Sequence, residues 1–178
     1  MANYLCRATN PRVPDYLVKK VSVPTGVTLH AGDIVYLKAL DTNIDNNYQV
    51  YAAGKPATAD LGLRAAIIIN DGFETLPDGR RPDGQPDYTQ YTYQAGDVVT
   101  AILLVSGLDF EVSTDAISGS VSVGSFVEPV DGQYAGKVVA SRTSGTTSAM
   151  KVLATKNFRI GGQFGYQFID TVVATVVD

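Results

Sequence analysis

Residues 95–105 read Ala-Gly-Asp-Val-Val-Thr-Ala-Ile-Leu-Leu-Val, a tight turn followed by a long run of β-prone residues. Gly96 can take backbone angles that other residues resist, and Asp97 can cap a bend through its side-chain oxygen. The β-branched residues that follow favour an extended strand. Nearly the same letters, Ala-Gly-Asp-Ile-Val, recur at residues 31–35. The repeat indicates either one turn design used twice or a pair of duplicated lobes.

Outward from these turns, the chain alternates with a period of two nearly everywhere and shows almost no helical periodicity. Turns containing Gly, Pro or Asp separate short apolar runs at intervals of about ten residues. Residues 34–37 and 48–52 are expected to form one hairpin, and residues 137–140 and 150–154 another. Residues 63–69 fit a buried strand or a short helix leading into one. The pattern predicts an all-β fold, a compact β-barrel or β-sandwich of short antiparallel strands with at most one short helix.

The segment 76–92 differs in amino-acid composition from the rest of the chain. Three prolines and two Asp-Gly pairs fall between residues 76 and 88, so neither a strand nor a helix interior fits there. We expect a long Pro/Gly-rich loop that is exposed. The chain then divides into an extended N-terminal arm, residues 1–16, and a β domain, residues 17–178. That domain reads as one body or as two lobes, 17–75 and 93–178, joined by the loop.

Composition narrows the classes of function. Charged residues make up only 18% of the 178, below the quarter or so typical of soluble domains. A surface with few charges suits permanent contacts, although a chain rich in Gly, Ser, Thr and Tyr has the same composition. The net charge of −4 and the scattered cations argue against nucleic-acid binding. No stretch approaches the roughly 20 apolar residues of a membrane span, and no signal peptide is visible.

Catalytic and metal-binding patterns are sparse. The chain has one histidine, His30, which we expect to be a solvated residue at a turn, and one cysteine, Cys6. This pair supplies neither a hydrolytic triad nor a zinc site, so we expect no enzyme activity and no cofactor. Residues 41–46 place oxygen-bearing side chains like the start of a calcium loop, but Ala52 stands where a bidentate carboxylate is needed. Calcium binding and a plain Asx-rich turn both stay open for this segment.

Aromatic residues gather in two places. Tyr88, Tyr91 and Tyr93 follow the loop, and Phe158, Phe164, Tyr166 and Phe168 lie near the C-terminus, on either side of the break expected at Gly161 and Gly162. In a strand, Tyr91 and Tyr93 share one face. Core packing, a protein interface and a sugar-binding platform each fit such clusters.

A series of short motifs follows residue 92. They are the turn and strand at 93–101, the Ser-Gly-Leu turn at 106–108, the strand at 110–113, the turn and strand at 123–127, the Asp-Gly turn at 131–132 and the strand at 137–139. Together they resemble the small capsid decoration proteins, also called head-stabilising or cement proteins, of tailed bacteriophages. The resemblance covers mainly residues 93–178 and more loosely 17–75, and the loop at 76–92 matches no pattern of that family.

The resemblance implies a non-enzymatic virion protein that is assembled in the host cytoplasm and binds the outer capsid surface. Its partners would be the major capsid protein and other copies of itself, with a trimer favoured. Proteins of that family often extend a terminal segment to complete a strand with a neighbour, and residues 1–16 suit this role unless they are simply a frayed terminus. The candidate contact residues are Arg7, Pro11, Arg12, Pro14, Arg80, Arg81, Tyr88, Tyr91 and Tyr93. A tail or baseplate component, a glycan-binding module and a β-barrel enzyme are the other classes considered.

Overall fold

Five strands close into a barrel in the computed structural model, which describes residues 2–10, 12–42, 49–57, 64–70, 90–144, 146, 148–162 and 165–177, without the side chains of 158–168. The barrel order is β2-β4-β3-β5-β6, and β6 pairs with β2 to complete the ring. The strands are β2 (Val18–Ser22), β3 (Ile34–Leu40), β4 (Val50–Gly54), β5 (Arg64–Ile68) and β6 (Val98–Leu103). Only β2 and β4 run parallel; the other neighbours in the ring are antiparallel.

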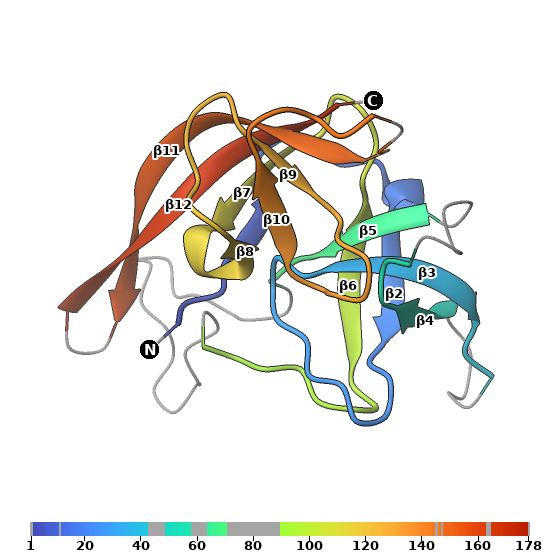
Figure 1. Ribbon diagram of the computed structural model, residues 1–178. Helices are drawn as coiled ribbons and strands as arrows, with labels where there is room; N and C mark the ends of the chain where they lie inside the picture. Colours follow the sequence, from blue (N-terminus) through green and yellow to red (C-terminus); the bar gives the residue numbers. More distant parts are fainter. Residues whose placement is uncertain are drawn as a thin grey trace.

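A curled sheet of seven strands packs against the barrel, in the order β1-β7-β12-β11-β9-β10-β8 (Figure 1). Its strands are β1 (Cys6–Ala8), β7 (Asp109–Ser113), β8 (Ile117–Ser118), β9 (Phe126–Glu128), β10 (Gly136–Val139), β11 (Ala149–Gly162) and β12 (Gly165–Val177). Two short 3-10 turns, η1 (Asp15–Leu17) and η3 (Thr114–Ala116), are the helical elements of the described residues. The predicted all-β fold with a β-barrel is confirmed.

One hydrophobic core joins the barrel to the sheet. It includes Ile34 and Ile67 of the barrel together with Phe110, Val112 and Met150 of the sheet, and all five side chains are almost fully buried. A backbone hydrogen bond from Ile34 N–H to the Tyr134 carbonyl, 2.7 Å long, also crosses between the two parts. Because the core is continuous, we describe barrel and sheet as one body.

A four-residue turn with a third-position glycine leads into four of the strands. The turns are residues 30–33 before β3, 94–97 before β6, 105–108 before β7 and 122–125 before β9. Each glycine has a positive φ, between 88° and 97°, which favours glycine over residues with a Cβ. In every copy the turn exchanges two backbone hydrogen bonds with one residue of a neighbouring segment. The glycine N–H donates to the carbonyl of that residue, and the N–H of that residue donates to the carbonyl of the fourth turn residue.

The side chain of the fourth residue caps this turn in three copies. Asp33 accepts a hydrogen bond from the N–H of His30 at 2.7 Å, and Asp97 accepts one from Gln94 at 2.8 Å. Ser125 accepts one from the N–H of Ser122 with its hydroxyl at 3.4 Å. The repeated Ala-Gly-Asp motif is therefore a single turn design used repeatedly, since the same geometry recurs at sites that lack the motif.

One predicted strand pairing is wrong. Residues 137–140 and 150–154 do not form a hairpin, because β9 lies between β10 and β11 and pairs with both. At the break expected at Gly161 and Gly162, β11 does end, and these glycines pair with the start of β12 across a hairpin. The hairpin of β3 with β4 is observed as expected, and residues 64–68 are a strand.

Part of the expected extended N-terminal arm, residues 1–16, is built into the body. Strand β1 pairs antiparallel with β7, and Leu5 and Cys6 are buried. Asn70 covers the other edge of β1: its side-chain oxygen accepts from Cys6 N–H at 2.7 Å, and its own N–H donates to the Cys6 carbonyl at 3.0 Å. The segment does complete a strand pair, but its partner is the chain's own sheet.

Candidate interaction site

Beyond the main sheet, β11 and β12 continue as a two-stranded ribbon, defined here as residues 153–162 of β11 and 165–170 of β12. These strands pair with each other up to Gly162 opposite Gly165. Strand β7 pairs with β12 only at Thr171–Thr175, and β9 pairs with β11 only at Met150 and Lys151. Among the described residues the ribbon therefore has no other strand partner, and Figure 1 shows it projecting from the body at the lower left.

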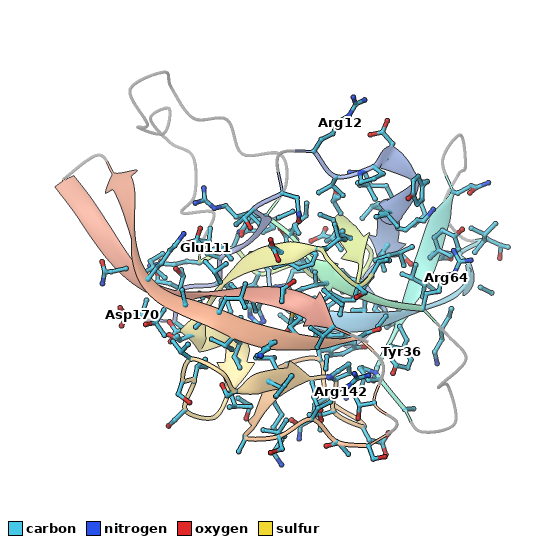
Figure 2. All side chains as sticks on the ribbon, turned by 90° about the horizontal axis from the view of Figure 1, so that it is seen from above. Arg12, Tyr36, Arg64, Glu111, Arg142 and Asp170 are labelled. Atoms are coloured by element: carbon cyan, nitrogen blue, oxygen red, sulfur yellow. The ribbon has the colours of Figure 1, made fainter. Side chains whose placement is uncertain are left out.

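Hydrogen bonds hold the base of the ribbon. Asn157 donates from its amide to the Asp170 carboxylate at 3.0 Å, across the directly opposed pair of residues. The Thr114 hydroxyl of η3 donates to the Asp170 carbonyl at 3.3 Å. Figure 2 labels Asp170 where the ribbon leaves the body. The ribbon is thus an extension of the main sheet rather than a separate hairpin.

Other strand edges of the described structure are closed, short or covered. The barrel has no edge because β6 returns to β2. At one end of the curled sheet Asn70 occupies the outer backbone groups of Cys6, and at the other end β8 has only two residues. Unpaired N–H and C=O groups on a strand edge are a ready template for another chain. The ribbon consequently offers the longest open edges in the described part of the molecule.

Arg7, a predicted contact residue, forms an ion pair inside the protein. Its guanidinium donates from Nε and Nη2 to Oε2 of Glu111, at 3.0 and 2.6 Å. Glu111 is almost fully buried, and its Oε1 accepts from the Thr171 hydroxyl at 2.8 Å. The Arg7 side chain remains 51% exposed. Arg7 thus has a structural partner of its own, which links β1, β7 and β12.

The described tyrosines of the predicted cluster lie beside the turn that leads into β6. Tyr93 is buried and exchanges two backbone hydrogen bonds with Leu29, at 2.9 and 3.0 Å. The ring of Tyr91 meets that of Tyr93 edge-on, with 5.2 Å between centroids. Tyr93 therefore packs in the core, and Tyr91 is half-buried against it. Neither residue lies in a regular strand as the sequence pattern implied.

The remaining predicted contact residues divide into two groups. Arg12 is exposed, and Figure 2 shows it pointing away from the body. Pro14 precedes η1, where its carbonyl accepts a hydrogen bond from Leu17 N–H at 2.9 Å. Outside the described residues lie Pro11, Arg80, Arg81 and Tyr88, together with most of the predicted loop 76–92 and residues 43–46 of the possible calcium turn.

No protein-family model, curated protein or solved structure matches this chain. Its function must therefore be argued from its own fold and surfaces.

The residues considered as candidate catalytic or metal-binding groups are held in the fold by ring stacking, burial or hydrogen bonds. His30 is not a solvated turn residue: its side chain is 25% exposed and its ring stacks on Tyr4 at 4.0 Å. Burial raises the pKa of the Cys6 thiol, which disfavours the reactive thiolate. Asp41 accepts a hydrogen bond from the Ser22 hydroxyl at 2.6 Å. Among the described residues no three His, Cys, Asp or Glu side chains converge on a possible metal position.

Sequence reasoning missed the ribbon, because it ended the strand that begins at residue 150 at residue 154 and expected a break at Gly161 and Gly162. The signal that could have found it is the alternation of polar and apolar residues from Asn157 to Ile160. Within the described chain, no helix has the length and apolar character needed to cross a membrane.

Proposed function

We propose that this protein is a non-enzymatic structural component of a bacteriophage particle, which binds the outer surface of the capsid and stabilises it. The observation that carries the proposal is the ribbon, an open pair of strand edges on a body whose other described edges are closed, short or covered. Its partners would be the major capsid protein and further copies of itself, with a trimer as the favoured state. The protein would be assembled in the host cytoplasm and reside on the virion.

The ribbon supports this function through strand addition. An extended segment of a neighbouring chain can pair with an open edge, and main-chain hydrogen bonds then give affinity without a particular side-chain pocket. An isolated two-stranded hairpin is only marginally stable in water, so a third strand would stabilise the ribbon as well as the complex. The ribbon thus replaces residues 1–16 as the proposed element of β-augmentation, because β1 is already paired on one edge and covered at Cys6 on the other.

The closed barrel and the shared core support the proposed role in stabilising the capsid. A decoration protein has to keep its shape while the shell is under internal pressure, and a barrel has no edge from which to unzip. The same ribbon would also suit a tail or baseplate component, since strand addition does not depend on the identity of the neighbour. Binding to capsids separates these two readings.

The test is co-sedimentation with expanded capsid shells of the phage whose particle would contain this chain. In the key variant, Asn-Gly replaces residues 158–169 and forms a two-residue turn between Asn157 and Asp170, which are paired in the native ribbon. Lys137→Gln, an exposed change on β10, serves as the control. We expect saturable, stoichiometric binding of the native chain and the control, and a loss of at least about tenfold in affinity for the short-ribbon variant, as expected when main-chain pairing is removed.

Two results would overturn the proposal at different points. If the native chain does not bind the shells, the capsid function fails, and binding to tail assemblies becomes the next measurement. If the short-ribbon variant retains its thermal unfolding transition and binds like the native chain, the ribbon is not the contact. Sedimentation analysis of the unbound protein tests the trimer separately.

A further inference from the structure

A pocket of about 510 Å³ opens at one end of the barrel, where β2 and β5 begin and β6 ends. The volume lies within the range of about 300–1,000 Å³ that is common for ligand pockets. Figure 2 labels Arg64, a lining residue, on the side of the molecule away from the ribbon. The pocket is therefore separate from the surface to which the proposed function assigns capsid binding.

Part of the pocket lining, which we call its floor, consists of leucines and is held in place by the barrel. Leu17, Leu103 and Leu104 line it, and each is less than a tenth exposed. The N–H of Leu104 donates to the Ala65 carbonyl at 3.0 Å, so β5 and β6 remain joined below the opening. A floor fixed by strand pairing cannot collapse readily, which leaves a preformed hollow with leucines on one side.

The rim supplies one charge. Among the described lining residues only Arg64 is charged; its side chain is exposed and has no hydrogen bond or ion pair to any described residue. Tyr16, a residue that is 71% exposed, and Ser148 also line the pocket. A guanidinium is planar and matches a carboxylate with two parallel hydrogen bonds. Arg64 is thus a cation beside leucine side chains, and no acidic residue is among the described residues that line the pocket.

We propose that this pocket binds an apolar carboxylate, with the chain or ring on the leucine floor and the carboxylate paired with Arg64. The pairing would set the orientation, because a neutral analogue could fill the floor but would leave the guanidinium without its partner. The same chemistry occurs in a free fatty acid and in the carboxyl end of a peptide. The inference stands on the pocket alone and does not depend on capsid binding.

Isothermal titration of the full chain with two acid–neutral pairs tests the proposal. The first pair is decanoate and decanol, which represents a free acid, and the second is N-acetyl-leucyl-phenylalanine and its carboxamide, which represents a peptide end. We expect at least one acid to bind about five- to tenfold more tightly than its neutral analogue, as a partly exposed charge-assisted contact would produce. The acid that exceeds its neutral analogue by the larger factor shows whether the ligand is a free acid or the carboxyl end of a peptide.

Variants connect that preference to the pocket. Arg64→Gln should remove the difference between acid and neutral analogue, whereas Lys137→Gln, with the same loss of charge on an exposed strand position, should preserve it. Val105→Trp, at a partly exposed lining residue, should weaken both members of the pair by filling the opening. The proposal is overturned if neither acid binds more tightly than its analogue, or if Arg64→Gln leaves the preference unchanged while the variant stays folded.

Discussion

Gly32 and Gly96 occupy the same position in two copies of one turn, yet alanine should be tolerated far better at Gly96. Both glycines have a positive φ, 97° and 90°, and both turns have the same backbone hydrogen bonds. They differ in what surrounds them. An ideal Cβ on Gly96 would have no atom within 4 Å, whereas one on Gly32 would lie 2.6 Å from the Ala116 Cβ and 3.1 Å from the Val112 Cγ1.

The free energy of unfolding should fall by different amounts for these two reasons. A left-handed conformation costs a residue with a Cβ about 1–2 kcal/mol, and we expect Gly96→Ala to lose about that much. Gly32→Ala has the same backbone cost and also overpacks the junction between barrel and sheet, which adds about 1–3 kcal/mol. The difference between the two variants, about 1–3 kcal/mol, isolates the packing contribution because the turn strain is common to both.

Guanidinium unfolding of both variants measures this difference, and thermal unfolding checks it. In a chain of this size, 1 kcal/mol corresponds to about 2–4 °C in the melting temperature. Adding Ala116→Gly to Gly32→Ala removes the closest contact and should recover part of the loss relative to Ala116→Gly alone. Equal losses for Gly32→Ala and Gly96→Ala would refute the view that Gly32 lets the sheet approach the barrel.

Three further expectations concern the N-terminal strand. Arg7→Met should lower the free energy of unfolding by about 2 kcal/mol, because it leaves the buried Glu111 carboxylate with one described partner. Adding Glu111→Gln should restore part of that loss, and additive effects in the double-mutant cycle would contradict a coupling between Arg7 and Glu111. The Cys6 thiol should resist a thiol reagent in the native protein and react fully in denaturant, because burial raises its pKa and excludes the reagent; rapid stoichiometric labelling under native conditions would show that β1 is not packed. Deleting residues 2–9 should cost at least about 3 kcal/mol, since buried side chains and the neighbour of β7 are lost together; a truncated chain with an unchanged thermal transition would make β1 dispensable.

The sequence predicts the parts of this fold that local chemistry determines. The turn at residues 94–97 is recognisable because a glycine and an aspartate define it within four residues, and the strand after it follows from β-branched residues. The hairpin of β3 with β4 is also local. By contrast, β1 has only three residues, and it is a strand because Val112 and Asn70 lie on either side of Cys6. No periodicity within residues 1–16 could reveal those distant partners.

The candidate site shows the same division. The ribbon was missed because Gly161 and Gly162 looked like a break, while the pairing of each residue with the opposite strand determines where the hairpin ends. Arg7 looked like a free anchor because its partner, Glu111, lies more than a hundred residues away in the sequence. Arg64 and Tyr16 attracted no attention, since the pocket exists only once the ends of β2, β5 and β6 are brought together.

The order β1-β7-β12 places residues from the start, the middle and the end of the chain side by side in one sheet. During synthesis, the barrel strands have all been made by residue 103, but β7 cannot acquire its second neighbour until Thr175 has left the ribosome. Pairings so distant in sequence slow folding, because a long loop must close before any contact rewards it. In a nascent chain of this protein, β7 should therefore stay sensitive to proteases until translation is nearly complete.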